Sequence, residues 1–329
     1  MKKRLLYGAG IVVVILLVWA GIFAWKNLRG IGPVVRKPSF DITEIVSPKV
    51  GDTISKNVTG LPLTLPPGFS ISIFAKGLGK PRVMTKDEAG NILVSIPSQG
   101  KVVALSDFND DGVAEATTTV IDGLNRPHGL LMDCRDTSVA MPVSRCHLFI
   151  AETSAVVRYD YNTDTRKATR RHVLFTLPTG GNHFTRTIIA LPNDERLAVS
   201  VGSSCNVCNE KDWRRAVILI TNQEGTAVEP FASGLRNAVF MAVQPETGKL
   251  WATEMGRDLL GDDLPPDEIN IVERGDYGWP YCYGKQVHDD AFDPKKTRSC
   301  DKTIPSTIDL PAHSAPLGLA FVPNPSTSS

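Results

Sequence analysis

The sequence predicts an all-β fold made of repeated hairpins, of the kind that form the blades of a β-propeller. Short apolar runs alternate with turns rich in Gly, Pro, Asn and Asp, and the 329-residue chain holds 27 glycines and 23 prolines. Such runs between turn residues are typical of β-strands. A unit of turn, strand, turn and strand also recurs, at spacings that suit propeller blades with loops of variable length. The copies begin at Lys80, Arg126, Asn182, Leu235 and His313.

The repeats also bear on how complete the fold is. The same order of turns and strands in each copy favours a propeller over a sandwich of unrelated hairpins. The fifth copy, however, is followed directly by residues 323–329, PNPSTSS. A closed propeller leaves no sheet edge free. We therefore expect an incomplete propeller, with about four to five blades in this chain.

The residues ahead of the repeats predict a membrane anchor and a linker. The uncharged run at residues 5–25 follows a basic tail, residues 1–4, and at about 1.5 Å per residue it would span a bilayer core of ~30 Å. The basic flank predicts a cytoplasmic N-terminus and a main domain on the periplasmic or extracellular side. A cleaved signal peptide is the alternative, and it would export the domain equally. Residues 26–65 are interpreted as a linker and residues 66–329 as the propeller.

Charge and short motifs exclude several function classes. The formal net charge of +1 gives no support to a nucleic-acid partner. The sequence contains no glycine-rich phosphate loop of the G-x-G-x-x-G or Walker kind, so a nicotinamide-dependent enzyme and an ATPase have no support either. Six cysteines in a chain expected to be exported favour disulfide bonds over free thiols.

Four short motifs follow one another in the fourth repeat and just beyond it. They are GLRN at 234–237, TEMG at 253–256, DEIN at 267–270 and YGWP at 277–280. In this order they resemble the glucose/sorbosone dehydrogenase family, six-bladed propeller enzymes that use pyrroloquinoline quinone (PQQ) and calcium. The resemblance covers residues 66–323. It implies oxidation of an aldose or related sugar hydroxyl by hydride transfer to the quinone.

His183 is the candidate general base. It stands in the sequence GGNHFTRT, just ahead of a predicted strand, where the resemblance implies that the family places its base. A neutral imidazole can take the hydroxyl proton as the hydride leaves carbon, although the residues alone also allow a hydrogen-bonded structural histidine. Asp267 is the candidate carboxylate that orients the imidazole. Other acidic residues nearby leave this second assignment open: Asp262, Asp263 and Glu268.

The same resemblance implies positions that bind the cofactors and the substrate. Arg236 and Asn237 would hold the quinone, because paired guanidinium donors match carboxylates, and the alternative for Arg236 is a salt bridge at the top of a blade. Gly256 and Arg257 would offer backbone carbonyl oxygens to the calcium ion, which takes oxygen ligands. His128 precedes a strand of the second repeat, and we expect it to line the sugar pocket.

A second, structural calcium site is predicted away from these motifs. The stretch DFNDDGVAE has the first nine positions of an EF-hand loop, with oxygen-bearing side chains at positions 1, 3, 5 and 9. Position 12, usually Glu, is Thr118 in this chain, so a plain Asp/Asn turn is the alternative. The candidate ligands are Asp107, Asn109, Asp111 and Glu115.

Cys205 and Cys208 form a C-x-x-C motif without the following His that haem attachment requires. The run VSVGSSCNVC resembles the sorbosone dehydrogenase branch of the family, and we interpret the pair as a local disulfide in a loop that lines the pocket. A redox role would need a thioredoxin-like context that the sequence lacks. The other pairs expected from proximity in the sequence are Cys134–Cys146 and Cys282–Cys300.

Two other functions compete with the dehydrogenase. One is a calcium-dependent propeller hydrolase, such as a lactonase, and the other is a non-catalytic propeller that binds a carbohydrate or a protein. A lactonase-like site would hold its metal through Glu, Asn and Asp side chains, whereas Arg236 near His183 favours an anionic cofactor. We therefore predict a PQQ-dependent sugar dehydrogenase, with a sugar substrate and an electron acceptor that the sequence does not identify.

Overall fold

The computed structural model describes residues 14, 16–22, 56–135, 145–192 and 195–322. Most regular structure in these ranges is β-strand, and no helix among the described residues is both long and apolar enough to cross a membrane. The predicted cytoplasmic tail lies outside the described residues, as do most of the predicted anchor and linker.

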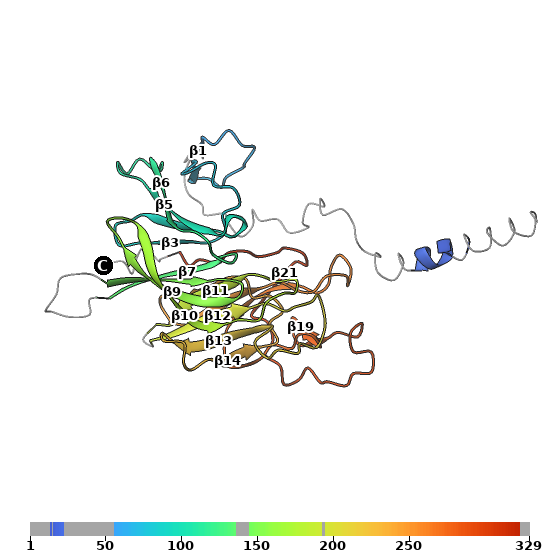
Figure 1. Ribbon diagram of the computed structural model, residues 1–329. Helices are drawn as coiled ribbons and strands as arrows, with labels where there is room; N and C mark the ends of the chain where they lie inside the picture. The colour runs from blue at the N-terminus through green and yellow to red at the C-terminus, as the bar shows by residue number, and fades with distance from the viewer. Residues whose placement is uncertain (1–13, 15, 23–55, 136–144, 193–194, 323–329) are drawn as a thin grey trace, which may run out of the picture.

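Four antiparallel sheets follow one another along the chain (Figure 1). Blade 1 contains β3 (Met84–Lys86), β4 (Ile92–Ile96), β5 (Lys101–Ser106) and β6 (Ala116–Ile121). Blade 2 contains β7 (Gly129–Arg135), β8 (Arg145–Ala151), β9 (Ala155–Asn162) and β10 (Lys167–Thr176). Blade 3 contains β11 (Arg186–Ala190), β12 (Arg196–Val201), β13 (Val217–Asn222) and β14 (Glu229–Ser233). Blade 4 contains β15 (Met241–Val243), β16 (Leu250–Glu254), β17 (Asp267–Ile271) and β21 (Ile308–Leu310).

The sheets confirm the predicted all-β, propeller-like repeat. Each blade begins within one of the first four predicted copies of the repeat, and the first strands of successive blades contact each other. The fifth predicted copy contains no strand in its described residues, 313–322. The remaining short elements are β1 (Lys56–Asn57), β2 (Ser70–Ile71), the 3-10 turn Pro97–Gln99, β18 (Gly275–Asp276), which extends blade 3 in parallel with β14, and the hairpin of β19 (Cys282–Tyr283) with β20 (Val287–His288).

The core lies between the blades, and both faces of the middle strands are buried. Leu148 and Phe149, neighbours on β8, are both fully buried, but Leu148 packs between blades 1 and 2 whereas Phe149 packs between blades 2 and 3. Leu197 and Ala198 on β12 divide in the same way between the cores on either side of blade 3. Successive side chains of a strand point to opposite faces, so a strand with two buried faces has a continuous apolar sequence.

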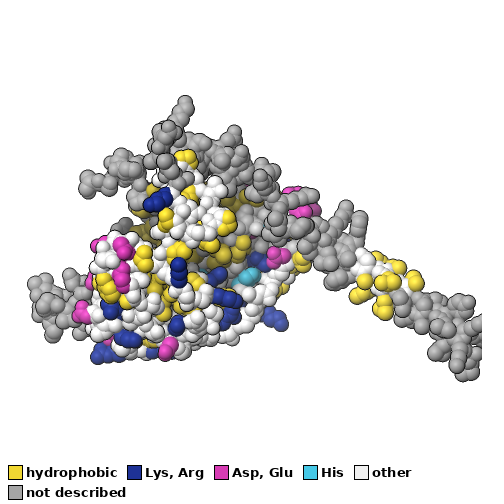
Figure 2. Space-filling model, turned by 90° about the horizontal axis from the view of Figure 1, so that it is seen from above, with side chains coloured by type: hydrophobic (Ala, Val, Ile, Leu, Met, Phe, Trp, Pro, Cys, Tyr) yellow, Lys and Arg dark blue, Asp and Glu magenta, His cyan; other side chains and the backbone are white. Residues whose placement is uncertain are grey.

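The turns that carry the candidate site lie at one edge of the sheets. In a four-stranded antiparallel sheet, the start of the first strand and the turn between the second and third strands share an edge. Residues 177–185 and 202–216 meet at this edge of blade 3, and residues 234–240 and 255–266 meet at the same edge of blade 4. Figure 2, a view of the molecule from above, shows Lys and Arg side chains spread over the visible face of the blades.

Candidate active site

His183 has the geometry of a general base. Its Nδ1 lies 3.0 Å from both the carbonyl oxygen and the Oγ of the buried Ser203. Because the carbonyl can only accept, Nδ1 carries the proton and Nε2 has a free lone pair. Burial first, and then the charge of Arg236, lowers the pKa of His183 to about 4. The imidazole is therefore neutral near pH 7 and presents an unprotonated nitrogen, as general-base catalysis requires.

Ser203 is held in turn by the loop that follows β12. Its Oγ donates a hydrogen bond to the carbonyl of Cys205 at 2.6 Å, so the same oxygen accepts from the Nδ1–H of His183. Its backbone N–H donates to the carbonyl of Arg236 at 2.7 Å. Ser203 therefore connects the histidine of blade 3 with the arginine ahead of blade 4.

Arg236 is a buried cation whose five donors all have acceptors in the protein. Its Nε and one terminal nitrogen donate to the backbone and side-chain oxygens of Asn206, both at 2.9 Å. The same terminal nitrogen donates to Asp258, at 3.1 Å, and the other donates to the carbonyls of Met255 and Gly256, at 3.2 and 2.8 Å. Burial lowers the pKa of Arg236 from its usual value. The Asp258 carboxylate is 64% exposed, so it is the acceptor that an anionic ligand could replace.

Asn237 lies against His183 with only a glycine between them. A Cβ added to Gly202 would lie 2.6 Å from the Oδ1 of Asn237 and 2.7 Å from the Cβ of His183. Glycine is thus required for these two residues to approach. The structure therefore brings together three of the residues that the sequence predicts for the site, His183, Arg236 and Asn237, from two successive blades.

Asp267 is placed differently from the prediction. One of its carboxylate oxygens accepts from the backbone N–H of Gly256 at 2.8 Å and the other from that of Ala315 at 2.6 Å. Burial raises its pKa above the usual value. The expected hydrogen bond from His183 to Asp267 is wrong, because Asp267 binds backbone groups around its own blade while Ser203 takes the imidazole Nδ1–H. Asp267 still lies close enough to Arg236 for their charges to interact.

His128 does not line a pocket. Its side chain is only 1% exposed, and its Nδ1 lies 3.1 Å from the carbonyl oxygen of Arg186 in the neighbouring blade. Its own carbonyl accepts from the Oγ of Ser95 at 2.8 Å in the blade on the other side. The predicted contact with a sugar is therefore wrong, since this histidine joins three blades and offers no surface to a substrate.

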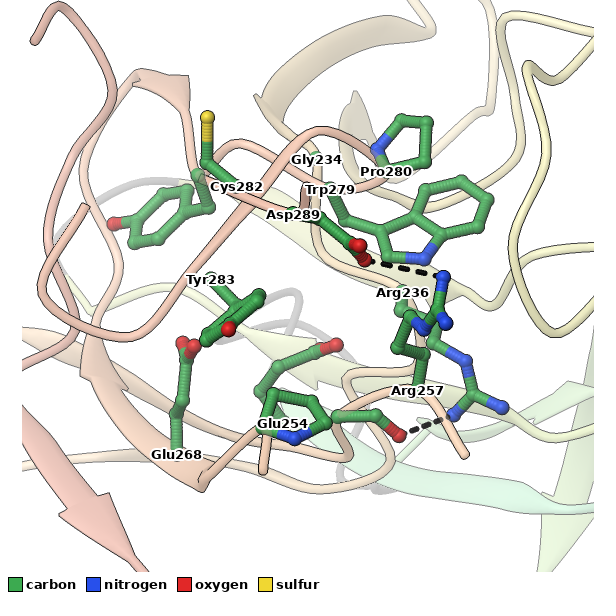
Figure 3. Close-up of a pocket in the computed structure, with 13 residues that line it drawn as sticks. Gly234, Arg236, Glu254, Arg257, Glu268, Trp279, Pro280, Cys282, Tyr283 and Asp289 are labelled. Carbon is green, nitrogen blue, oxygen red and sulfur yellow. Dashed lines mark hydrogen bonds and ion pairs between the residues drawn. The ribbon is translucent and has the colours of Figure 1, made fainter. Parts of the chain in front are cut away.

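The loop that carries Gly256 and Arg257 is anchored by an ion pair. Arg257 forms an ion pair of 3.1 Å with Asp289, and both side chains are nearly buried. Glu254 and Glu268 line the same cavity (Figure 3), which measures about 20 Å³, enough for about one water molecule. Burial and their mutual repulsion raise the pKa of Glu254 well above its usual value.

The residues fit an anionic quinone in charge, and they fit a calcium ion less well at Gly256. Arg236 supplies a positive charge beside the neutral His183, and one of its hydrogen bonds goes to an exposed, replaceable carboxylate. The carbonyl of Gly256, by contrast, accepts from the Arg236 guanidinium at 2.8 Å, and this charge disfavours a cation at the same oxygen. The calcium ligands predicted at Gly256 and Arg257 remain a prediction.

The second predicted calcium loop gathers its carboxylates at the turn between β5 and β6. Oxygen atoms of Asp107, Asp111 and Glu115 all lie within 4.8 Å of one another. The Oδ1 of Asp107 is buried without a hydrogen-bond partner among the described residues. The side chain of Asn109 accepts from the backbone N–H of Asp111 at 3.0 Å and so shapes the turn. The structural calcium site at these residues stays a prediction.

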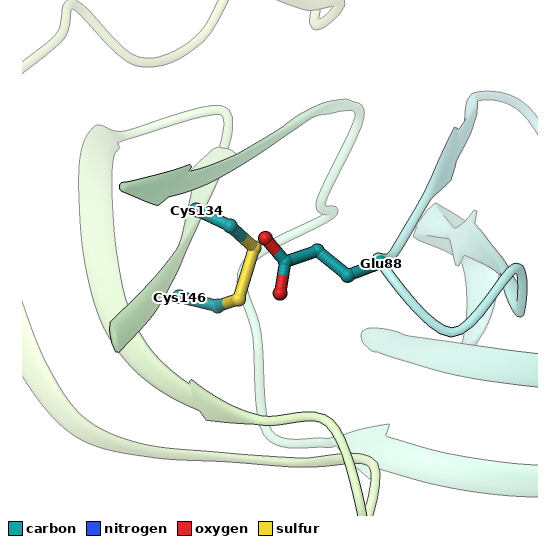
Figure 4. Close-up of side chains that lie close together, drawn as sticks. All are labelled: Glu88, Cys134 and Cys146. Carbon is teal, nitrogen blue, oxygen red and sulfur yellow. A yellow bond between two sulfur atoms is a disulfide. The ribbon is translucent and has the colours of Figure 1, made fainter. Parts of the chain in front are cut away.

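The three predicted disulfides are confirmed, and they remove two apparent metal clusters. The bonds are Cys134–Cys146, Cys205–Cys208 and Cys282–Cys300. Glu88 lies beside the first of them (Figure 4) and Glu210 lies beside the second. Sulfur in a disulfide is not a thiolate, and the thiolate is the metal ligand. Neither cluster is therefore a metal site in the oxidised protein.

Sequence reasoning missed Ser203 and Asn206. Both lie in the loop around the C-x-x-C motif, which the sequence identified as part of the pocket wall. Neither residue type signals catalysis by itself, since Ser and Asn are common in turns. Their roles follow only from the contact between this loop and the turns that carry His183 and Arg236.

Comparisons with known proteins give relatives in sequence and in fold. The PQQ-dependent sugar dehydrogenase of Hypocrea jecorina (strain QM6a) is 27% identical over 255 residues, which make up 66% of this chain and 56% of that protein. The holo form of the pyranose dehydrogenase PQQ domain from Coprinopsis cinerea superimposes with a TM-score of 0.66 at 20% identity, over 82% of this chain and 76% of that one. The calcium structure of the Trichoderma reesei AA12 enzyme gives 0.59 at 23%, over 74% and 71%.

The structural likenesses, at these identities, show the propeller fold. Family membership rests on a separate match, because the family model described as TrAA12-like matches residues 63–328, most of the chain. The resemblance to PQQ-dependent dehydrogenases is thereby confirmed at the level of the family, while the sorbosone branch is not singled out. The chain belongs to the TrAA12-like family.

Proposed function

We propose that this chain carries the active site of a PQQ-dependent dehydrogenase that oxidises a hydroxyl of an aldose or related sugar. One observation carries the proposal: a neutral, partly exposed His183 with a free Nε2 lies beside the buried cation Arg236 at one edge of the propeller. The named relatives supply the cofactor class, PQQ with calcium. The chain spans 56% of the curated Hypocrea relative, so activity and substrate are proposals here.

In this proposal the protein moves a proton and holds charge. Bound PQQ supplies the two-electron acceptor for the hydride that leaves the sugar carbon. The Nε2 of His183 takes the hydroxyl proton, so the alcohol becomes a carbonyl. Ser203 keeps the imidazole in the tautomer that leaves Nε2 free. Arg236 gives the site the positive charge that an anionic, carboxylate-bearing cofactor needs, once the exposed Asp258 yields its hydrogen bond.

The membrane anchor and the calcium ion belong to the same proposal. We infer from the sequence that residues 5–25 anchor an exported domain, and fractionation of expressing cells tests this: a soluble mature form without these residues would contradict it. The calcium ion is proposed from the resemblance and the relatives, and titration of the purified protein with calcium tests it.

A binding and activity assay tests the function. Purified protein is titrated with PQQ in the presence of calcium, and reduction of a redox dye is then followed with a panel of aldoses. We expect saturable PQQ binding and sugar-dependent dye reduction that His183→Gln lowers by roughly 10²-fold or more. Hydrolysis of lactones without PQQ would support the hydrolase alternative. Carbohydrate binding without turnover would support the binding alternative, and either result would refute the dehydrogenase.

A further inference from the structure

The loop closed by the Cys205–Cys208 disulfide holds both central residues of the site. We call residues 203–210, between β12 and β13, the disulfide loop. Ser203, at its start, binds His183, and Asn206, between the two cysteines, binds Arg236. The turn that carries His183 also docks on the loop, since the backbone N–H of Asn182 donates to the carbonyl of Ser204 at 2.9 Å.

Asn206 contacts both the guanidinium of Arg236 and the backbone of Asp258. Its backbone oxygen and its Oδ1 accept from two different nitrogens of the guanidinium, both at 2.9 Å. The same Oδ1 accepts from the backbone N–H of Asp258 at 2.8 Å, and its Nδ2 donates to the carbonyl of Asp258 at 3.0 Å. One asparagine therefore fixes the guanidinium plane and the turn that carries the replaceable carboxylate.

The rest of the loop is anchored independently of Arg236. Ser204 donates from its backbone and side chain to the Glu210 carboxylate, at 2.5 and 2.8 Å. Asn209 accepts from the Tyr281 hydroxyl at 2.9 Å. A four-residue segment closed by a disulfide and tied at its end in this way has few ways to move. Asn206 is thus presented to Arg236 from a rigid support.

We propose that Asn206, fixed by the Cys205–Cys208 disulfide, is the positioning residue that holds the Arg236 guanidinium in place beside His183. The inference rests on the proposed function for its effect on PQQ but not for its effect on Arg236. In this proposal the disulfide has no redox role, and it acts only by holding the loop closed. Loss of either the amide or the disulfide should loosen the guanidinium, which keeps its hydrogen bonds to the carbonyls of Met255 and Gly256.

The first test needs no cofactor. The wild-type protein and Asn206→Ala are compared by NMR of arginine side chains, with the guanidinium signals of Arg236 assigned through Arg236→Lys. We expect hydrogen exchange at the terminal N–H that donates to the Oδ1 of Asn206 to be faster by roughly tenfold or more in Asn206→Ala, because this side-chain acceptor of a charge-assisted hydrogen bond is lost. The Nε–H is an internal control, since its acceptor is the backbone carbonyl of residue 206. Asn206→Asp, which keeps the accepting oxygen, should retain the protection. Unchanged exchange in Asn206→Ala would overturn the proposal.

A matched control lies in the same loop. Asn209→Ala removes an amide that contacts Tyr281 and not Arg236, so it should leave the Arg236 signal unchanged. The double variant Cys205→Ser with Cys208→Ser should accelerate exchange as Asn206→Ala does. Cys134→Ser with Cys146→Ser, which opens a disulfide between β7 and β8, should not. Equal effects of Asn206→Ala and Asn209→Ala would mean that the loop acts only as general support, and would refute the specific role.

The second test measures PQQ binding. We expect the Kd for PQQ to rise roughly tenfold in Asn206→Ala, about the loss of one charge-assisted hydrogen bond's contribution, and to stay near wild type in Asn209→Ala. If exchange at Arg236 changes as expected while the wild-type protein binds no PQQ, the proposed function fails and the positioning role stands. If PQQ binds wild type and Asn206→Ala equally, the positioning role fails and the proposed function stands.

Discussion

His128 and His183 occupy equivalent places in successive repeats, each in the turn ahead of the first strand of a blade, yet they differ in what surrounds them. Both have pKa values lowered to about 4, and burial is the first cause for each. The Nδ1 of each histidine faces a backbone carbonyl, of Arg186 for His128 and of Ser203 for His183. His128, however, is 1% exposed, whereas His183 keeps part of its surface and a free Nε2.

The comparison separates a structural histidine from a candidate catalytic one by access and not by acidity. A lowered pKa with a defined tautomer marks both residues, so neither property identifies the base alone. What His183 adds is an open nitrogen beside a cation, within contact distance of a glycine that admits Asn237. A general base needs reach to the proton as well as the right protonation state.

The largest expected difference between the two histidines is in catalysis. His183→Gln should lower kcat/KM for sugar oxidation by roughly 10²–10⁴-fold, the usual contribution of a general base, because no other neutral nitrogen replaces Nε2. Binding of PQQ should change little, since His183 holds no cofactor group in the proposal. Steady-state kinetics and a PQQ titration of the same preparation measure both. Wild-type turnover in this variant would end the assignment of the base.

The sequence could predict the repeats because their physical signal is local. Runs such as LFIA on β8 are apolar throughout, since both faces of the strand are buried between blades, and turn residues mark their ends. The repeats also account for the meeting of His183, Arg236 and Asn237, because turns ahead of successive blades gather at one edge. The three disulfides followed from proximity and export.

The burial of His128 and the partner of His183 could not be predicted, because they depend on contacts between turns from different blades. Nothing in the residues around His128 shows that the carbonyl of Arg186, from the next blade, closes over it. Asp267 was the expected partner of His183 because carboxylates commonly orient catalytic imidazoles. In the structure the loop after β12 lies against the imidazole, and Ser203 accepts its hydrogen bond. Partner choice of this kind is set by packing, which sequence pattern does not encode.

The second prediction concerns the pH dependence of stability. The pKa of His128 is about 4 in the folded protein and its ordinary value is 6.5, so between these values the unfolded chain binds more protons than the folded one. The contribution of His128 to the free energy of unfolding therefore rises with pH across this window. As the pH falls from about 6.5 to 4, this contribution decreases by about 3 kcal/mol for a fully buried histidine. Urea denaturation at several pH values measures the slope.

The variant His128→Leu isolates this contribution. Buried carboxylates with raised pKa values, such as Glu254 and Glu268, act in the opposite direction, so the slope of the wild-type protein alone is a mixture. Subtracting the slope of His128→Leu from that of the wild type should leave a positive dependence on pH between 4 and 6.5. A difference of zero would contradict a neutral, buried His128.

The third prediction is the stability of the same variant at pH 7. His128→Leu leaves the carbonyl of Arg186 without its donor inside the protein, which should cost about 1–3 kcal/mol. Chemical denaturation at pH 7 measures the loss. Activity per folded molecule should remain near wild type, because His128 has no contact with the proposed site. A selective loss of kcat without a loss of stability would instead restore His128 as a substrate contact.

The smallest expected effect concerns Ser203, whose hydroxyl gives the imidazole of His183 a second hydrogen-bond acceptor. Ser203→Ala removes the hydroxyl that accepts from the Nδ1–H of His183 but leaves the backbone carbonyl, which also lies 3.0 Å away. The tautomer should therefore persist, and kcat/KM should fall by about tenfold or less, the size of one hydrogen bond's contribution. Ser204→Ala, whose hydroxyl binds Glu210 instead, is the matched control. A loss as large as that of His183→Gln would mean that the hydroxyl, and not the carbonyl, fixes the imidazole.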